Sequence, residues 1–288
     1  MSRIAIFGGK GYLGSQLAAY FAAKGVAYDV FDVPAFDVTR ADCWETFLPT
    51  DYSAILFFAG MTGTEKSFTA AERFLDVNEQ GLLNLLMRLA YLGTHAPKII
   101  FPSTRLVYKG SDEPLSEDAP KEAKTVYAAN KLACEYLLQA YHVRYGIPYV
   151  VFRICVPYGN IVSHDYSYGT IGAFIRQVKE KGEISLFGGG VQRRTFTSVM
   201  DICKVVWWSC ESCPTGVFNI GGEAMSLNEV ASSIAQKMGG SVRSVPWPDT
   251  ALAIESGSTV FDDSKLKAVM GQGHVWERMA DNLERFFQ

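Results

Sequence analysis

The sequence lacks any apolar run long enough to cross a bilayer. Its apolar runs, such as residues 54–59 and 149–152, are far shorter than the roughly 20 residues that a spanning helix needs. An excess of positive charge is also missing, since 27 Lys and Arg face 30 Asp and Glu. No basic field is therefore available to hold nucleic acid or an anionic membrane surface. The first residues offer one Arg and no small-residue cleavage site, so we expect a cytoplasmic protein.

Metal-ligating side chains are few and scattered. Four histidines lie far apart, and none pairs with another at ligand spacing. The cysteines are spread through apolar segments, as expected of reduced packing residues, and are Cys43, Cys134, Cys155, Cys203, Cys210 and Cys213. Cys210 and Cys213 form a C-x-x-C, a pattern found in redox sites and in halves of zinc sites. No second pair or nearby histidine completes a set, so we expect no metal.

Short apolar, β-rich runs alternate with longer helical patterns through the first half of the chain. We predict strands at residues 3–7, 28–33, 54–59, 98–101 and 149–154, and helices at residues 11–25, 70–92, 127–145 and 171–180. Strands with unbroken apolar runs, separated by helices, are typical of a parallel sheet covered on both faces. The pattern predicts an α/β fold with a doubly wound parallel sheet of the Rossmann type.

A glycine-rich turn joins the first predicted strand to the first predicted helix. Gly8, Gly11 and Gly14 follow a G-x-x-G-x-x-G spacing, with Tyr12 and Leu13 between the last two. Glycine permits the tight turn and lets the backbone approach a pyrophosphate at the helix N-terminus, where N–H groups and the dipole favour anions. The turn predicts a dinucleotide-binding site.

An acid ends the second predicted strand. Asp32 lies close to the roughly 20-residue spacing expected of a carboxylate that binds ribose. A carboxylate there accepts hydrogen bonds from both adenosine ribose hydroxyls and repels a 2′-phosphate, so we predict NAD rather than NADP. Asp37, followed by Val38, is predicted either to reach the adenine edge or to lie in an exposed turn.

Tyr127 and Lys131 are four residues apart in a predicted helix, so their side chains lie on one face. A tyrosine is a poor base at neutral pH because its pKa is about 10. A neighbouring ammonium and an oxidised nicotinamide both stabilise the phenolate and lower that pKa. Thr104 or Ser103, at the end of the preceding strand, could hydrogen-bond the same substrate oxygen. These residues predict an acid/base site beside a nicotinamide.

Together these motifs, and others in the same order along the chain, resemble the extended short-chain dehydrogenase/reductase family, in its nucleotide-sugar epimerase/dehydratase branch. The further segments are Ala59-Gly60, Asn78, Val107-Tyr108, Arg153, Pro157-Tyr158-Gly159, Arg193-Arg194 through Asp201, Phe218-Asn219 through Gly222, and Asp262 through Leu266. The resemblance covers nearly the whole length. It implies a sugar nucleotide whose pyranose C4 faces the nicotinamide.

The resemblance also implies roles for single residues. Tyr127 would be the catalytic acid/base, Lys131 would tune it, and Thr104 would share the contact to the substrate hydroxyl. Arg194 would contact the substrate diphosphate or, alternatively, form a salt bridge to Asp201 or another acid. Asn219 is expected to brace the substrate loop. The cofactor site would comprise Gly8, Gly11, Tyr12, Leu13, Gly14, Asp32, Asp37, Val38, Ala59, Gly60, Asn78, Ser103, Tyr127 and Lys131.

The chain departs from the branch at three places. Dehydratases carry an Asp-Glu pair directly after the threonine, where this chain has Arg105 and Leu106, so 4,6-dehydration is not expected. We place Arg105 on the substrate side. Val156 replaces an asparagine that many sugar-nucleotide enzymes use. Residues 252–258 contain no arginine to serve as a second diphosphate ligand.

We therefore expect an NAD-dependent nucleotide-sugar epimerase that acts at C4 through a transient 4-keto intermediate. The alternative is an NAD(P)H-dependent reductase of 4-keto-6-deoxy sugar nucleotides, and a third interpretation is a catalytically silent NAD sensor. By resemblance we expect a homodimer and a setting in polysaccharide biosynthesis.

The domain organisation follows from where the pattern changes. The regular alternation ends near Tyr158, and residues 160–169 are predicted to form a loop on a functional rim. We predict an NAD-binding Rossmann domain over residues 1–158. Residues 159–288 are predicted to be mostly a substrate-binding lobe, with segments that return to the sheet.

Overall fold

The computed structural model describes residues 3–162, 168–271 and 273–283. These residues form two compact units. The first comprises the described parts of Met1–Val107, Ala123–Arg153 and Cys203–Phe218, and the second comprises those of Tyr108–Glu122, Ile154–Ile202 and Asn219–Gln288. The loop predicted over residues 160–169 lies partly outside the described residues. The predicted boundary near residue 158 stays a prediction.

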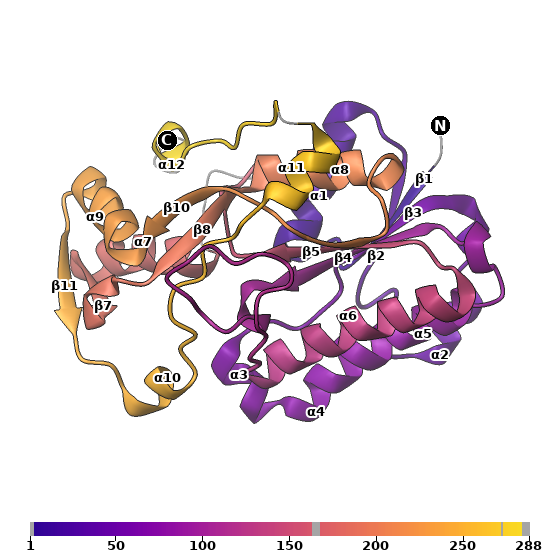
Figure 1. The fold of residues 1–288 in the computed structure, drawn as a ribbon, viewed down its shortest axis with the longest axis horizontal. Coiled ribbons are helices and arrows are strands. Elements are labelled where there is room, and N and C mark those ends of the chain that lie inside the picture. The colour runs from indigo at the N-terminus through magenta and orange to yellow at the C-terminus, as the bar shows by residue number, and fades with distance from the viewer. Residues whose placement is uncertain (1–2, 163–167, 272, 284–288) are drawn as a thin grey trace. The chain divides into compact units, whose positions relative to one another are not determined.

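The first unit is built on a six-stranded sheet with the order β2-β1-β3-β4-β5-β9 (Figure 1). Its strands are β1 (Arg3–Phe7), β2 (Tyr28–Phe31), β3 (Tyr52–Phe57), β4 (Lys98–Thr104), β5 (Tyr149–Ile154) and β9 (Gly216–Asn219). The pairings β1–β2, β1–β3 and β3–β4 are parallel. The predicted α/β fold with a doubly wound parallel sheet is confirmed. The strand β9, from late in the chain, joins the edge beside β5.

Helices cover both faces of this sheet. α1 (Tyr12–Lys24) and α8 (Val199–Glu211) lie on one face, and α5 (Gly81–Leu89) and α6 (Val126–Tyr145) lie side by side on the other (Figure 1). Shorter elements are α2 (Ala41–Glu45), α3 (Thr64–Thr69), the one-turn helices η1 (Pro49–Asp51) and η3 (Gly93–His95), and η4 (Arg105–Val107). The core between the sheet and α5 and α6 includes stacked aromatic rings, among them Phe7 and Phe31 with ring centroids 4.8 Å apart. Burying these rings is a main source of the unit's stability.

The helix predicted over residues 70–92 is interrupted. The chain runs through α4 (Ala71–Phe74), then a π-helical turn η2 (Leu75–Gln80), and only then α5. Asn78, inside the turn, is buried and makes two hydrogen bonds to the backbone of Met61. Periodicity indicated a continuous helix because a π turn widens the backbone without breaking the apolar pattern, and such turns often occur at functional sites.

The second unit contains two small sheets. β6 (Val156–Tyr158), β8 (Arg193–Ser198) and β10 (Glu223–Ser226) form one, and β7 (Glu183–Phe187) pairs in parallel with β11 (Ser241–Val245) to form the other. Its helices are α7 (Gly169–Lys181), α9 (Leu227–Met238), α10 (Asp249–Ala253), α11 (Ser264–Met270), α12 (Met279–Leu283) and the turn η5 (Gly188–Gly190). α9 begins with a capping box between Ser226 and Glu229.

Each helix in the described part of the chain is too short or too polar to span a bilayer. No three His, Cys, Asp or Glu side chains gather there as a metal would require. All six cysteines are free thiols. Burial raises the pKa of the Cys210 thiol to about 12, which disfavours the thiolate that redox chemistry of a C-x-x-C would need.

Candidate active site

The glycine turn between β1 and α1 has no room for side chains. Gly8 adopts φ 81°, and a Cβ there would lie 2.4 Å from the backbone nitrogen of Ala59. A Cβ on Gly14 would lie 2.2 Å from the carbonyl oxygen of Gly8. Gly11, which has no side chain, caps α1, and the first turn of the helix contains no acidic residue. This cradle fits the pyrophosphate of NAD.

Asp32 ties the glycine turn to the end of β2. Its Oδ2 accepts a hydrogen bond from the N–H of Lys10 at 2.7 Å, and its Oδ1 accepts one from the N–H of Val33 at 2.8 Å. A carboxylate has about four acceptor positions, so capacity for ribose hydroxyls remains. Lys10 Nζ donates to the carbonyl of Val33 at 2.9 Å, which further fixes the turn.

Asp37 is engaged by its own turn. Its Oδ1 accepts hydrogen bonds from the N–H and hydroxyl of Thr39, and Arg73 lies 3.6 Å from its Oδ2. Burial acts to raise the pKa of Asp37, but these hydrogen bonds and the Arg73 charge bring it below the usual value. Val38 is buried, and its carbonyl accepts from Trp44 Nε1 at 2.9 Å. Adenine contacts by Asp37 and Val38 stay predictions.

Three predicted cofactor residues from separate elements meet. A Cβ built on Gly60, after β3, would lie 3.1 Å from Asn78 Oδ1 and 3.9 Å from Lys131 Nζ. Asn78 Oδ1 accepts the N–H of Met61 at 2.7 Å and its Nδ2 donates to the Met61 carbonyl at 3.1 Å, so the π turn holds the loop that follows β3. Because Gly60 has no Cβ, a ligand has room to approach the Lys131 ammonium at this position.

Lys131 is a buried ammonium. Its Nζ donates to the carbonyl of Pro102 at 2.7 Å and lies 4.4 Å from the ring centroid of Phe101. Burial lowers its pKa from 10.5 to about 8, and the neighbouring Cys134 and Glu135 oppose that shift. A positive charge with so little solvent is well suited to stabilise a nearby phenolate.

Tyr127 lies in the first turn of α6, which begins where the Thr125 side chain accepts the N–H of Ala128 at 3.1 Å. Its ring meets Phe74 edge-on, with centroids 6.4 Å apart. The helical spacing places Tyr127 and Lys131 on one face of α6, as predicted from the sequence. Tyr127 is partly exposed, as an acid/base must be to reach a substrate.

The two hydroxyls at the end of β4 have different partners. Ser103 donates to Glu135 of α6, whereas Thr104 Oγ1 accepts the N–H of Leu106 at 3.3 Å. Successive side chains of a strand point to opposite faces, so only one of the two can face a given ligand. Ser103 is committed to Glu135, and its cofactor contact stays a prediction. Arg105 and Leu106 follow in η4, so no acid pair stands after Thr104.

Arg194, predicted to contact a diphosphate, is a buried residue of β8. Its Nη2 donates to Glu255 Oε1 at 2.6 Å, and its Nη1 donates to the carbonyls of Arg193 and Gly257. The salt bridge that was the alternative interpretation is thus present, with Glu255 as the acid. The contact to a diphosphate stays a prediction.

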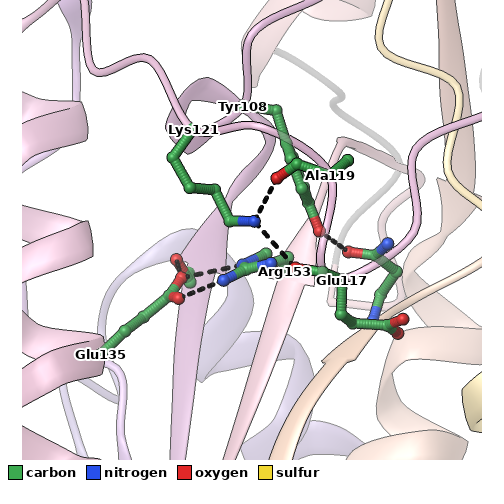
Figure 2. A network of polar contacts seen from close by, with 8 residues as sticks. Tyr108, Glu117, Ala119, Lys121, Glu135 and Arg153 are labelled. Carbon is green, nitrogen blue, oxygen red and sulfur yellow. Dashed lines mark hydrogen bonds and ion pairs between the residues drawn. The ribbon is translucent and has the colours of Figure 1, made fainter.

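Asn219 joins distant segments of the second unit. Its Oδ1 accepts the Tyr108 hydroxyl at 2.7 Å, and its Nδ2 donates to the carbonyl of Leu115 at 2.8 Å. That Asn219 braces the substrate loop stays a prediction. Tyr108 and Leu115 belong to the segment Tyr108–Glu122, in which Lys121 Nζ donates to the carbonyls of Glu117 and Ala119 (Figure 2).

Two residues of this arrangement were not selected from the sequence as site residues. Glu135 stands four residues after Lys131, a spacing that could have pointed to it. Glu255 lies in residues 252–258, the stretch in which the chain lacks an arginine. Its pairing with Arg194 spans 61 residues of chain, and no local pattern indicates it.

A family model described as "NAD dependent epimerase/dehydratase family" matches residues 4–221. The chain belongs to this family, and the resemblance stated from its motifs is confirmed. It is 30% identical over 207 residues to UDP-glucuronate 4-epimerase of Thermodesulfobacterium geofontis, covering 70% of this chain and 62% of that protein. It is 32% identical over 185 residues to dTDP-D-glucose 4,6-dehydratase of Mus musculus, covering 63% and 51%. The alignments thus span about half to three fifths of these relatives.

The fold has close structural counterparts. The dTDP-glucose 4,6-dehydratase DesIV of Streptomyces venezuelae, solved with NAD bound, matches with a TM-score of 0.86 and 23% identity over 99% of this chain and 95% of that chain. At this identity the likeness shows the fold alone. The family is NAD-dependent, in agreement with the cofactor predicted from the glycine turn and Asp32.

Proposed function

We propose that the chain is an NAD-dependent nucleotide-sugar epimerase that acts at the pyranose C4. The observation that carries the proposal is the buried ammonium of Lys131, beside Gly60 and Asn78 and on the same helix face as Tyr127. A relative at 30% identity is a UDP-glucuronate 4-epimerase, which supports this reaction class.

The residues present assign a place to each part of the cofactor. The glycine turn would hold the pyrophosphate, Asp32 the adenosine ribose, and Lys131 the nicotinamide ribose. When bound, NAD would supply a reversible hydride acceptor. The protein contributes the cradle, the ribose carboxylate and a fixed positive charge.

Tyr127 would remove the C4 hydroxyl proton, and the Lys131 ammonium would stabilise the phenolate that makes this possible. Thr104 Oγ1 would hydrogen-bond the same substrate oxygen and orient it. The substrate becomes a transient 4-keto sugar, which turns in the pocket. Tyr127 then returns its proton to the C4 oxygen when the other face of the sugar is reduced.

Arg105 and Leu106 separate this proposal from 4,6-dehydration. Elimination of water across C5 and C6 needs an acid and a base beside the threonine, and neither an always-charged guanidinium nor an alkyl side chain supplies them. The chain is similar to dehydratases in sequence and fold, but Arg105 and Leu106 do not supply that acid and base.

A second candidate is a reductase of 4-keto-6-deoxy sugar nucleotides that uses the same Tyr127, Lys131 and Thr104 in one direction. The pairing of Arg194 with Glu255, together with Val156 and the missing arginine in residues 252–258, favours it. These features indicate a substrate pocket that differs from that of typical epimerases.

Chromatography of the cofactor released by denaturing freshly purified protein tests the two candidates. The epimerase is expected to retain near-stoichiometric NAD, because its cofactor is recycled, and to interconvert C4 epimers of a UDP- or dTDP-sugar without added cofactor. Protein that emerges without nicotinamide and oxidises added NADH or NADPH only with a 4-keto sugar nucleotide would establish the reductase instead.

We further propose that the protein forms a homodimer. Large side chains of α5 and α6, including Met87, Tyr136 and Val143, are exposed, which supports a homodimer formed through these helices. Light scattering on the purified protein would measure its mass. We place the reaction in the cytoplasm, where it would supply sugar nucleotides for polysaccharide biosynthesis.

A further inference from the structure

Two further polar side chains lie on the stripe of α6 that carries Tyr127 and Lys131. Asn130 and Cys134 follow Tyr127 by three and seven residues, and this helical spacing places all four residues on one side of α6. Asn130 is 1% exposed and Cys134 is fully buried. Their burial means that other elements of the first unit cover this side of the helix.

The π turn η2 is fastened to this stripe by two hydrogen bonds. Asn130 Nδ2 donates to Glu79 Oε1, and Cys134 Sγ donates to the carbonyl of Asn78 at 3.2 Å. A thiol is a weak donor, whereas hydrogen bonds to a carboxylate are among the stronger ones in proteins. The pair of Asn130 and Glu79 is therefore the stronger of the two links between the π turn and α6.

The residue that precedes Glu79 holds the loop after β3. Asn78 makes two hydrogen bonds to the backbone of Met61. A Cβ built on the preceding residue, Gly60, would lie 3.1 Å from Asn78 Oδ1 and 3.9 Å from Lys131 Nζ. One chain of contacts thus runs from α6 through the π turn to this loop and back to the ammonium on α6. A shift of the π turn along α6 would move the loop relative to Lys131, and groups that position a ligand tolerate little displacement.

The Asn130 amide uses only part of its hydrogen-bonding capacity. Its Oδ1 is buried and has no hydrogen-bond partner among residues 3–162, 168–271 and 273–283. A carboxylate only accepts hydrogen bonds, so Glu79 fixes the amide with Nδ2 toward it and Oδ1 away. An unsatisfied buried acceptor destabilises the folded state, and an alanine at this helix position would avoid that cost. Fold stability alone therefore does not account for Asn130, whereas fixing the π turn does.

We propose that Asn130 and Glu79 are positioning residues: their hydrogen bond sets the π turn against α6 and so places the loop after β3 beside the Lys131 ammonium, where the nicotinamide end of NAD binds. The consequence for NAD rests on the proposed function, in which Lys131 holds the nicotinamide ribose, whereas the effect on the π turn does not. A merely structural pair would change the stability of the fold and leave both the affinity for NAD and the local order of this loop unchanged.

The direct test exchanges donor and acceptor in the full chain freed of nucleotide, with NAD affinity measured by calorimetry. Asn130→Asp places two carboxylates against one another, so the affinity is expected to fall by about tenfold. In Asn130→Asp/Glu79→Gln the glutamine amide donates to the new aspartate and the pair keeps its wild-type charge, so the affinity is expected to return to within about twofold of the wild type.

Gln80→Ala is the matched control, because it removes a hydrogen bond to Asn84 from an exposed residue of the same turn. This variant is expected to bind NAD as the wild type does. Wild-type affinity in folded Asn130→Asp would overturn the proposal. So would a folded Asn130→Asp/Glu79→Gln that binds NAD no better than Asn130→Asp.

Amide hydrogen exchange measures the order of the loop directly. Asn130→Ala/Glu79→Ala removes both polar groups and leaves neither buried without its partner, so it also covers the case in which Asn130→Asp fails to fold. Because Asn78 Oδ1 accepts the Met61 N–H at 2.7 Å, exchange at this amide is expected to become about tenfold faster. The amide of Ile55 within β3 is the reference for global unfolding. A Met61 amide that changes by no more than the Ile55 amide would overturn the proposal.

Lys131→Met separates failure of this proposal from failure of the proposed function. If it binds NAD as tightly as the wild type, Lys131 does not hold the nicotinamide ribose, and exchange at the Met61 amide still decides whether the pair sets the π turn. Weaker NAD binding by Lys131→Met, but not by folded Asn130→Ala/Glu79→Ala, would retain the proposed function and refute the positioning role.

Discussion

The two units of this protein each bury a cation that the sequence marks as functional, and the two cations are treated differently. Lys131 in the first unit donates to a backbone carbonyl and lies over an aromatic ring. Arg194 in the second unit is 2% exposed and donates to the Glu255 carboxylate and two carbonyls. The Arg194 guanidinium is thus paired with a carboxylate, whereas the Lys131 ammonium donates to an uncharged carbonyl.

Burial has different consequences for the charge of a lysine and for that of an arginine. A buried lysine can lose its proton, so its pKa falls and its charge becomes adjustable. An arginine stays charged, so a buried arginine needs a negatively charged or hydrogen-bonding partner. It then has a structural role unless a ligand replaces that partner. The buried charge of Lys131 in the first unit therefore suits the role that we propose for it beside Tyr127. In the second, a substrate diphosphate would have to compete with Glu255.

The largest effect is expected from removing the acid/base. Tyr127→Phe keeps the ring against Phe74 but removes the hydroxyl, and kcat is expected to fall by about 10²–10⁴-fold. Tyr136→Phe is the matched control, because Tyr136 is an exposed residue of the same helix. Steady-state turnover of the C4 epimers measures both. A Tyr127→Phe variant with wild-type kcat would remove the catalytic role from the first unit.

The next effect concerns the cofactor carboxylate. Asp32→Asn is expected to weaken NAD binding by about 10-fold or more, since charge-assisted hydrogen bonds to the ribose and to the Lys10 N–H are lost. Asp29→Asn, on the same strand but paired with Arg3 at the surface, serves as the control. Calorimetry on protein freed of nucleotide measures the affinity. An equal loss in both variants would mean that Asp32 acts only through the stability of β2.

The next prediction removes the carboxylate that pairs with Arg194, which would leave the guanidinium available to a diphosphate. Glu255→Gln keeps the side-chain shape but removes the competing charge, so affinity for UDP or dTDP is expected to rise by about 10-fold. Glu183→Gln, from an exposed pair with Arg243, is expected to change nothing. The comparison uses calorimetry at low salt. Unchanged or weaker nucleotide binding by folded Glu255→Gln would identify Arg194 as a brace that does not meet the diphosphate.

The smallest effect is on stability. The folded-state pKa of Lys131, about 8, lies below its unfolded value of 10.5, so the unfolded chain binds more protons between these values and stability rises with pH. Between pH 7 and 9 the wild type is expected to gain about 1 kcal/mol of unfolding free energy relative to Lys131→Met. Urea unfolding of both proteins at each pH measures the gain, and a difference independent of pH would mean that the lysine's pKa is not depressed.

Much of the first unit could be predicted because its signals are local. The strands 3–7 and 149–154 and the helix of Tyr127 and Lys131 follow from short-range periodicity, and the structure places them within a residue of the prediction. Lys131 was predicted from its spacing to Tyr127, and Gly60 and Asn78 from the family's motifs. The structure then brings them together.

The π turn at Asn78 could not be predicted in the same way. A hydrophobic pattern reports which face of a helix is buried, but it does not report a local widening of the backbone. The turn depends on side-chain hydrogen bonds to Met61, which belongs to a different loop. The same limit explains why Ser103 and Thr104 could not be separated, since the choice depends on which of them faces Glu135.

The sequence by itself determined the fold class, the glycine turn, the carboxylate after β2 and the Tyr127–Lys131 row, because each depends on residue type and short spacing along one element. Only the tertiary structure decided which charges meet. Glu135 with Arg153, and Arg194 with Glu255, join residues 18 and 61 positions apart. The strength of a buried charge depends on its distance to partners and its removal from water, and both are set by packing between elements.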